Sequence, residues 1–519
     1  MGISTVADII RVHGVERAGH PALIQGERCV TWGALRERSA QVARGLADAG
    51  VGPGDRIAFL DKNGIEHFEV YFGAAMLNAV CVDVNWRLAA PEVEFIVNDA
   101  EAKVLVVGPD FVPVLDAIAA NLTTVGKIVV IGTGSDHEQY DDWVARFPAD
   151  DPGVGAGADD IAFQLYSSGT TGRPKGVMLT NANFFGLVPV AEEIWEMSPD
   201  AVNLVAMPLF HIGGGGWAMA GMYYGCTSVV LRDMDPAALV ALIGQRRITH
   251  GFLVPAVLQF MLMVPGVAEA DLSSLQVLVY GASPISEDVL ARSVTTFGCK
   301  LWQTYGLTET TGAIVNLPPA DHDPAGPNRH RLRSCGLPGP GVEVRIVDAN
   351  TSIDLPTGDV GEIWIRSPQV MKGYWHQPDE TAKAIVDGWF RTGDAGYLDD
   401  DGYLFIHDRV KDMIVSGGEN VYPAEVENAL MAHPAVADVA VIGVPHEKWG
   451  ETAKAIVVRA PAAEVTEAEL IAFCRDHLAK FKCPTSVDWA DALPRNPSGK
   501  ILKKDLRAPY WEGRTRNVN

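Results

Sequence analysis

The chain has 519 residues, of which 48% are hydrophobic, and a formal net charge of −23 at pH 7. A chain of this length exceeds the usual size of one domain, so we expect several domains. The acidic balance argues against nucleic-acid binding or anionic-membrane binding as the main task.

The cysteines and the apolar runs indicate the cell compartment. The seven cysteines are widely spaced and form no C-x-x-C pair, which is typical of reduced thiols and not of a disulfide framework or a zinc site. No apolar run approaches the ~18 residues of a membrane helix, and residues 1–14 lack the pattern of a secretion signal. We expect a cytoplasmic protein without an integral membrane segment.

The first part of the chain alternates helical patterns with short apolar runs. Residues 66–79 have apolar side chains at helical spacing, whereas residues 103–107 and 127–131 are compact apolar runs that predict buried strands. This alternation is typical of an α/β fold with a largely parallel sheet covered by helices.

Three further apolar runs each stop at a polar loop. The runs at 161–166, 276–280 and 301–304 lead into segments rich in Gly, Ser and Thr. In a parallel sheet, ligands bind beyond the carboxyl ends of the strands. We therefore expect the three loops to form one shared site.

From residue 335 onward the pattern changes to antiparallel strands. Residues 342–347 and 362–365 alternate like antiparallel strands, and residues 397–406 predict a hairpin closed by the turn at 399–402.

A small α+β unit of usual domain size ends the chain. Its predicted helices and strands lie at 424–431, 439–442, 455–458 and 467–479. We place the main boundary at residues 408–411, which gives an N-terminal domain of residues 1–408 and a C-terminal domain of residues 409–519.

The most specific motif is the loop within residues 166–176, Tyr-Ser-Ser-Gly-Thr-Thr-Gly-Arg-Pro-Lys-Gly. Lys175 adds a positive charge to hydroxyls and glycine amides that an anion can approach, which is typical of a phosphate-binding loop. The spacing is not that of a Walker A loop. A flexible linker is the alternative, but a linker needs neither Lys175 nor two adjacent threonines. The loop residues are Ser167, Ser168, Gly169, Thr170, Thr171 and Gly172.

Residues 166–176 resemble the signature of the adenylate-forming superfamily, which contains acyl-CoA synthetases, luciferases and nonribosomal adenylation domains. Further segments that match this superfamily follow in order at 207–211, 280–284, 305–309, 388–394, 408–414, 417–423 and 494–500. The chain resembles the acyl-CoA synthetases and fatty-acid–CoA ligases in particular. The resemblance implies a large N-terminal domain of parallel sheets flanked by helices, a small β-barrel-like subdomain and a mobile α+β C-terminal domain.

The resemblance also implies an ATP site. Tyr305 would lie against the adenine, and the Asp394 carboxylate would accept hydrogen bonds from the ribose hydroxyls, with Arg409 nearby. Glu309 and Thr170 would hold Mg²⁺, which takes oxygen ligands from one or two carboxylates and from phosphates. Taken singly, Tyr305 could be a core residue, Glu309 a helix N-terminal charge, and Asp394 and Arg409 surface charges. The loop residues, Lys175, Gly281, Ala282, Ser283, Gly306 and Thr308 would complete the site.

Lys500 matches the adenylation lysine of the superfamily. An anionic carboxylate must attack the α-phosphorus of an anionic nucleotide, and a cation offsets that repulsion. The expected catalytic residues are therefore Lys500, Glu309 and Thr170. Alone, Lys500 would be a solvated lysine.

A second reaction, thioester formation with coenzyme A, needs a different arrangement. In the superfamily the C-terminal domain rotates about a hinge, and Lys411 resembles the hinge residue. The rotation would bring Gly417, Gly418 and Glu419 beside the pantetheine arm of coenzyme A.

The acyl pocket carries the weakest signal. His211 ends an apolar run and is followed by four glycines, which would leave room for an acyl chain, although a core histidine and a structural turn are equal alternatives. The expected lining is His211, Gly213, Gly214, Trp217 and Phe252. An apolar pocket favours a medium- or long-chain fatty acid or a bulky ring acid, and aryl acids stay open.

Other functions remain to be separated from an acyl-CoA ligase. A stand-alone adenylation enzyme that loads a carrier protein is the main alternative, and a luciferase-type oxygenase and a silent binding protein are others. An amino-acid-activating enzyme needs a carboxylate for the ammonium group, whereas Asp233 and Asp235 are interpreted as loop charges. The expected partners are small molecules, with a homodimer implied by the resemblance.

Overall fold

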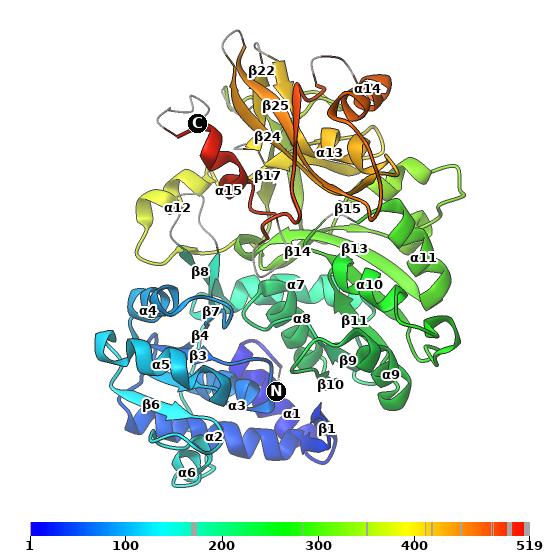
Figure 1. Cartoon of the computed structure of the whole chain (residues 1–519). Helices are drawn as coiled ribbons and strands as arrows, with labels where there is room; N and C mark the ends of the chain where they lie inside the picture. The colour runs from blue at the N-terminus through cyan, green and yellow to red at the C-terminus, as the bar shows by residue number, and fades with distance from the viewer. Residues whose placement is uncertain are drawn as a thin grey trace. The chain divides into compact units, whose positions relative to one another are not determined.

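The computed structural model describes residues 2–167, 174–283, 285–348, 351–409, 412–416, 419–446, 449–478, 480, 482–495 and 501–512 (Figure 1). The chain divides into two units. The first comprises Met1–Glu343 and Arg366–Phe390, and the second comprises Val344–Ile365 and Arg391–Asn519. The boundary predicted at 408–411 lies within the second unit and remains a prediction.

The first unit contains a seven-stranded sheet in the order β18-β8-β7-β4-β3-β5-β6. The pairs among β3, β4, β5, β6 and β7 are parallel, whereas β8 is antiparallel to both β7 and β18. Strands β3 and β4 are buried along their whole length, as in parallel sheets covered on both faces. The strands are β3 Arg56–Leu60, β4 Val80–Asp83, β5 Ala102–Val107, β6 Lys127–Val130, β7 Ile161–Ser167, β8 Lys175–Thr180 and β18 Gly373–Tyr374.

A nine-stranded sheet in the order β15-β14-β13-β12-β11-β9-β10-β1-β2 completes this unit. Its central strands β1, β10, β9, β11, β12 and β13 run parallel. The strands are β1 Pro21–Gln25, β2 Arg28–Thr31, β9 Val202–Val205, β10 Thr227–Val230, β11 His250–Leu253, β12 Val277–Gly281, β13 Lys300–Leu307, β14 Gly312–Leu317 and β15 Leu337–Pro338.

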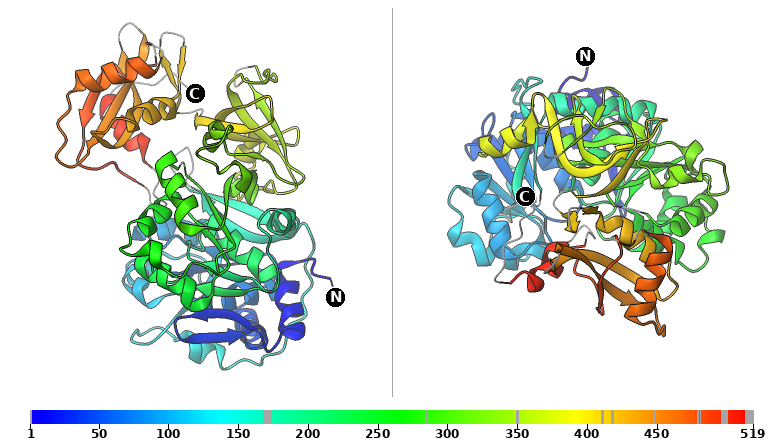
Figure 2. Two further views of the ribbon diagram at one scale, coloured as in Figure 1. Left: turned by 90° about the vertical axis from the view of Figure 1, so that its right-hand side faces the viewer. Right: turned by 90° about the horizontal axis from the view of Figure 1, so that it is seen from above.

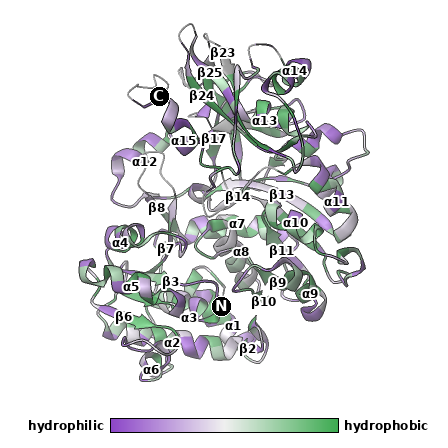
Figure 3. Cartoon of the chain, in the orientation of Figure 1, coloured by the Kyte–Doolittle hydropathy of each residue, from purple (hydrophilic) through white to green (hydrophobic). Residues whose placement is uncertain are grey.

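Twelve α-helices of this unit are described, and Figure 3 colours them by the hydropathy of their residues. They are α1 Val6–Glu16, α2 Trp32–Asp48, α3 Ile65–Met76, α4 Ala90–Asp99, α5 Val112–Ile118, α6 Tyr140–Val144, α7 Asn181–Glu193, α8 Ile212–Tyr223, α9 Pro236–Arg246, α10 Pro255–Leu262, α11 Glu287–Phe297 and α12 Pro378–Ala384. No helix in the described part of the chain has the length and apolar character to cross a membrane.

Helices α7 and α8 belong to two hydrophobic cores. Met219 of α8 packs in a core with β8 and β10, whereas Trp217 packs in a second core with β11 and β12. Buried residues surround most of α8, as expected for a helix enclosed on several sides. The loops at the ends of the two sheets are therefore supported by one shared pair of helices.

A further small sheet has the order β16-β17-β20-β19 with β21 paired to β20, and β20 runs antiparallel to both β19 and β21. The predicted hairpin is confirmed as β20 and β21, joined by the turn at residues 399–402. The strands are β16 Glu343–Val347, β17 Gly361–Arg366, β19 Ile385–Val386, β20 Trp389–Leu398 and β21 Leu404–Arg409.

The C-terminal sheet has the order β23-β22-β25-β24, with β26 beside β25. Alternate residues of β24 belong to two cores, so Val441 packs with α13 and α14 while Ile442 packs with Leu506 of α15. Figure 2 shows this sheet and its helices in two further views. The elements are β22 Ile414–Ser416, β23 Glu419–Val421, α13 Pro423–Met431, β24 Val436–His446, β25 Gly450–Arg459, α14 Glu467–His477, β26 Ser486–Trp489 and α15 Lys503–Arg507.

The predicted fold class is confirmed, because parallel sheets flanked by helices precede a small antiparallel sheet and an α+β C-terminal part. The three predicted loop strands, however, do not share one sheet. The run at 161–166 forms β7 in the seven-stranded sheet, whereas the runs at 276–280 and 301–304 form β12 and β13 in the nine-stranded sheet.

Candidate active site

The end of β7 and the segment that follows β13 meet at Glu309. The short 3₁₀ helix η4, Thr308–Thr310, follows β13 and carries this carboxylate. The Ser167 hydroxyl at the end of β7 donates a hydrogen bond to Glu309 Oε1 over 3.2 Å. The predicted convergence of a hydroxyl from the phosphate-loop motif and the metal-binding carboxylate is therefore present in the described residues.

Tyr374 is a member of this cluster that the sequence analysis missed. Its hydroxyl donates to the same Glu309 oxygen over 3.1 Å. Tyr374 lies in the two-residue strand β18, which pairs with β8. One tyrosine in so short a strand has no periodicity to reveal its role.

Residues 367–375, which we call the strap, fix both loops through backbone hydrogen bonds. The Met371 amide donates to the Glu309 carbonyl over 2.8 Å, and the Trp375 amide donates to the Gly176 carbonyl over 2.7 Å. Thr311 Oγ1 donates to the Gln369 carbonyl over 2.6 Å. The strap thus links η4, which follows β13 of the nine-stranded sheet, to β8 of the seven-stranded sheet.

Lys175 is held above the same cluster by α12. Its Nζ lies 2.6 Å from Glu380 Oε2 and 4.8 Å from the centre of the Tyr374 ring. Hydrogen bonds from Lys175 and then Lys383 lower the pKa of the Glu380 carboxyl to about 2. A phosphate group that binds Lys175 would therefore share it with Glu380.

A buried brace supports the start of the phosphate-loop motif. The Tyr166 hydroxyl donates to Asp99 Oδ2 over 2.6 Å. Arg56 Nε donates to Gln164 Oε1 over 3.1 Å, and the Arg56 guanidinium stacks 3.5 Å from the centre of the Trp375 ring. Burial lowers the pKa of Arg56.

The predicted adenine-side residues lie at the ends of β12 and β13. Gly281 ends β12 and Tyr305 and Gly306 are in β13. A Cβ at Gly306 would overlap the Gly312 carbonyl, so this glycine allows β13 and β14 to approach. Ala282 has a φ of +67°, which is uncommon for a residue with a side chain and typical of functional loops. Ser283 beside it is exposed.

The two predicted ribose-binding residues are neighbours in the second unit. Asp394 of β20 pairs with Arg409 of β21 in the antiparallel ladder. The Asp394 amide donates to Thr392 Oγ1 over 3.0 Å, and the preceding Gly393 has a φ of +70°.

Several predicted site residues lie outside the described residues, and their roles stay predictions. The backbone of Glu419 begins β23, where it pairs with Ser416. Those outside are Ser168, Gly169, Thr170, Thr171, Gly172, Lys411, Gly417, Gly418 and Lys500.

His211 precedes the first turn of α8. Its Nε2 is buried and has no hydrogen-bond partner in the described parts of the chain. Burial, and to a lesser degree the charge of Arg87, lower the pKa of His211 to about 4. The imidazole is therefore neutral at pH 7, which fits the predicted role in substrate binding better than a role in proton transfer.

The other predicted acyl-pocket residues pack together where α8 meets β11. A Cβ at Gly213 would lie 2.9 Å from Phe252 Cε1, and the Trp217 and Phe252 ring centres are 6.2 Å apart. A Cβ at Gly214 would overlap the Pro208 carbonyl. The glycine run is thus a helix start that allows close packing, not the turn that was the alternative.

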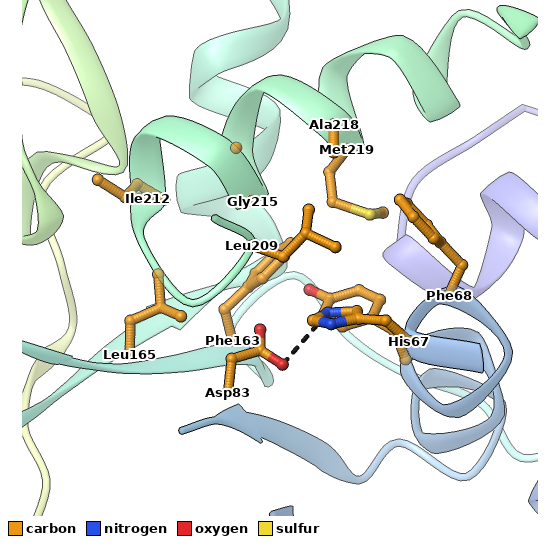
Figure 4. Close-up of a pocket in the computed structure, with 12 residues that line it drawn as sticks. His67, Phe68, Asp83, Phe163, Leu165, Leu209, Ile212, Gly215, Ala218 and Met219 are labelled. Carbon is orange, nitrogen blue, oxygen red and sulfur yellow. Dashed lines mark ion pairs between the residues drawn. The ribbon is translucent and has the colours of Figure 1, made fainter. Parts of the chain in front are cut away.

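A different face of α8 borders an internal cavity that the sequence analysis missed (Figure 4). Its volume is about 10 Å³, which is room for about one water molecule. The lining residues are His67, Phe68, Tyr71, Asp83, Phe163, Leu165, Leu209, Ile212, Gly215, Gly216, Ala218 and Met219.

The donor set fits a metal that arrives with a nucleotide. Among the described residues no three His, Cys, Asp or Glu side chains gather to hold a metal ion. Mg²⁺ typically takes one or two carboxylates and completes its shell with phosphates and waters. Glu309 beside the Ser167 hydroxyl could supply that part of the shell.

Comparisons with known proteins agree with this geometry. The AMP-binding enzyme family matches residues 11–375, and the AMP-binding enzyme C-terminal domain matches residues 425–500. The chain is 41% identical to the fatty acid–[acyl-carrier-protein] ligase ScoC of Streptomyces coeruleorubidus, over 100% of this chain and 98% of the relative. It is 40% identical to the long-chain-fatty-acid–CoA ligase FadD13 of Mycobacterium tuberculosis, over 92% of each chain. ATP-bound MatB from Rhodopseudomonas palustris has a TM-score of 0.87 at 32% identity, over 97% of this chain and 99% of that one. The chain therefore belongs to the AMP-binding enzyme family, within the adenylate-forming superfamily of ATP-using enzymes, and it groups there with the acid–thiol ligases.

Proposed function

We propose that this protein joins a hydrophobic carboxylic acid to coenzyme A in two steps that share one site. The acid first reacts with ATP to give an acyl-adenylate and pyrophosphate. The thiol of coenzyme A then displaces AMP. The observation that supports this proposal most directly is that Ser167 and Tyr374 both donate to Glu309 while Lys175 lies over the Tyr374 ring.

In the first step a carboxylate oxygen forms a bond to the α-phosphorus, and the bond from that phosphorus to the pyrophosphate oxygen breaks. Lys175 would contact the phosphates from its position above Tyr374. Glu309 would hold Mg²⁺, which supplies positive charge where negative charge develops. Lys500 would neutralise the transferring group.

In the second step the sulfur of coenzyme A bonds to the acyl carbon, and the carbon–oxygen bond to AMP breaks. A rotation about Lys411 would bring Gly417, Gly418 and Glu419 beside the pantetheine arm. A neutral His211 beside an apolar helix supports an uncharged acyl group, such as a fatty acid or a ring acid.

The alternative acceptor is the thiol of a carrier protein. The relative ScoC is named for this acceptor and FadD13 for coenzyme A. Both acceptors can present the same kind of pantetheine thiol, so the nucleotide site does not distinguish them. The predicted homodimer is likewise to be tested, by light scattering.

The test is pyrophosphate release from purified protein with ATP, Mg²⁺ and a panel of acids. We expect acid-dependent release, followed by AMP release when coenzyme A is added and a thioester of matching mass. Glu309→Gln should abolish the first signal, whereas Glu343→Gln, which changes an exposed carboxylate paired with Arg366, should not. Absence of pyrophosphate release with every acid would overturn the proposal. Thioester formed only on a carrier protein would establish the alternative acceptor.

A further inference from the structure

Lys175 is almost fully buried, and one carboxylate pairs with it. The residue is 8% exposed, and its Nζ donates to Glu380 Oε2 over 2.6 Å. No other carboxylate forms an ion pair with Lys175 in the part of the chain that the structure describes. Because a buried ammonium group is costly unless it is paired, Glu380 compensates the burial of Lys175.

Helix α12 holds Glu380 in this position. Thr381 Oγ1 accepts a hydrogen bond from the Tyr374 amide over 2.9 Å, which fixes α12 against the strap. The second carboxylate oxygen of Glu380, Oε1, lies 2.8 Å from Lys383 Nζ. Hydrogen bonds from the two lysines, Lys175 foremost, lower the pKa of Glu380 to about 2, so the carboxylate is ionised at pH 7. Glu380 therefore places a negative charge directly beside Lys175.

Lys175 also belongs to the cluster around Glu309. It pairs with Ser167 in the antiparallel ladder of β7 and β8, and Ser167 donates to Glu309 Oε1. A phosphate oxygen that accepts from Lys175 would lie within about 6 Å of Glu380 Oε2, because two hydrogen bonds of about 3 Å would meet at Nζ. Such a phosphate would divide the attraction of the lysine with a carboxylate that also repels it.

We propose that Glu380 competes with phosphate groups for Lys175 and so weakens the binding of ATP and of pyrophosphate, while it keeps the lysine in position. Glu380 is in this sense a positioning residue that acts through Lys175. The inference deepens the proposed function and rests on the role of Lys175 given there. Weaker binding is useful at this point of the reaction, because pyrophosphate must leave Lys175 after the adenylate has formed.

The sign of the effect separates competition from a purely structural role. A hydrogen bond to a carboxylate is roughly twice as strong as one to a neutral acceptor. Glu380→Gln keeps an oxygen acceptor of similar size but removes the negative charge, so Lys175 would be more available to phosphates and their affinity should rise. If Glu380 only kept Lys175 in place, the same substitution would lower the affinity or leave it unchanged.

The experiment is titration calorimetry of the purified chain with Mg²⁺ and either ATP or inorganic pyrophosphate. No acid is added, so no adenylate forms and binding is measured without turnover. We expect Glu380→Gln to lower the Kd for both ligands by roughly five- to tenfold, which is the difference between a charged and a neutral hydrogen bond. An unchanged or higher Kd for either ligand would overturn the inference.

A double-mutant cycle tests whether the effect passes through Lys175. Lys175→Met should raise the Kd for ATP. In that background Glu380→Gln should lower the Kd by about twofold or less, because only the direct repulsion between carboxylate and phosphate is then removed. An equal gain from Glu380→Gln with and without the lysine would show that Glu380 does not act through Lys175, and the inference would be wrong.

Glu196→Gln is the matched control, because Glu196 also pairs with a lysine at 2.6 Å, Lys300, which begins β13. Glu309 follows the other end of that strand, so the control should leave both Kd values unchanged. Failure of the proposed function gives a different result, because ATP would bind and yet no acid would cause the release of pyrophosphate. A Kd for ATP that Lys175→Met does not change would contradict the role of Lys175 and overturn the inference with it.

Discussion

Glu309 illustrates how much a single carboxylate depends on its neighbours. Oε1 accepts hydrogen bonds from Ser167 and Tyr374, while the backbone carbonyl of the same residue accepts from Met371. Two segments that are distant from Glu309 in sequence, the end of β7 and the strap, therefore determine where the carboxylate points. Groups that orient a metal ligand in this way are commonly needed for metal affinity as much as the ligand itself.

Tyr374→Phe removes one of these hydrogen bonds and keeps the ring under Lys175. We expect the Mg²⁺ concentration needed for half-maximal pyrophosphate release to rise by roughly 10- to 100-fold. Tyr224→Phe, which removes a hydroxyl that bonds Val188 and Glu192, is the control. The same Mg²⁺ requirement in all three proteins would show that Tyr374 does not position Glu309.

His211 gives a pH dependence of stability whose sign can be derived. Burial lowers its pKa from 6.5 to about 4. Between these pH values the imidazole is protonated in the unfolded chain and neutral in the folded chain. The contribution of His211 to the free energy of unfolding is complete above pH 6.5 and is lost as the pH falls from there toward 4. At pH 5 the loss from this residue is about 2 kcal/mol.

His211→Gln removes this titration, so its melting temperature should fall less between pH 7 and pH 5 than that of the wild type. Circular dichroism at both pH values measures the difference. His20→Gln, which changes an exposed imidazole, should behave like the wild type. A pH dependence of His211→Gln equal to that of the wild type would argue against the buried neutral imidazole.

The residues that sequence alone could reveal are those inside specific motifs. Glu309 and Lys175 stand in matched segments, so their roles could be predicted. Tyr374 could not, because its partner lies 65 residues away and nothing in the intervening sequence specifies the contact. The same holds for Glu380, which is 205 residues from Lys175.

Among the elements, parallel strands were the most predictable. Strand β12 is a continuous apolar run, and so is β5 from Val104 onward, because both faces of their sheets are buried. The assignment of β7 to a different sheet from β12 was not predictable, since pairing between distant strands depends on tertiary packing. The glycine run at the start of α8 was ambiguous for a related reason: its small residues are needed by Phe252 and Pro208, which approach from elsewhere in the chain.

The pair β7–β8 depends on the brace beneath it. Arg56→Met would remove the donor to the buried Gln164 Oε1 and the cation stacked on Trp375, which should lower the free energy of unfolding by about 1–3 kcal/mol. The KM for ATP should rise because β7 leads into the phosphate-loop motif. Arg56→Lys should restore little of the lost stability or of the affinity for ATP, since an ammonium group lacks the planar stacking surface of a guanidinium group.

Urea unfolding and ATP kinetics measure both effects of the Arg56 substitutions. Arg366→Met is the matched control, because Arg366 also lies over a tryptophan, Trp389, at 4.5 Å, but its side chain is 50% exposed. An exposed cation–π contact contributes about 0.5–1 kcal/mol. Equal effects of Arg56→Met and Arg366→Met would contradict a special role for the brace.

For the whole molecule, the two half-reactions make opposite demands on the C-terminal part. Adenylation needs a cation at the transferring phosphoryl group, and thioester formation needs access for a thiol to the acyl carbon. One rigid arrangement cannot place Lys500 at the phosphorus and leave the same space open to pantetheine. The hinge that the resemblance implies at Lys411 would resolve the conflict by separating the steps in time.

Because the two steps are proposed to depend on different residues, we expect that single substitutions can slow either step without slowing the other. Lys500→Ala should slow adenylation by on the order of 10²–10³, yet keep the rate of thioester formation from supplied acyl-adenylate, because that step does not use the lysine. Lys411→Pro should do the reverse, since a fixed φ at the hinge restricts the rotation that admits the thiol. Lys504→Ala, which changes an exposed lysine of α15, should affect neither step. Rapid-quench assays of the separate half-reactions distinguish these outcomes, and an equal loss of both steps in Lys500→Ala would mean that the cation supports the fold of the site and not adenylation itself.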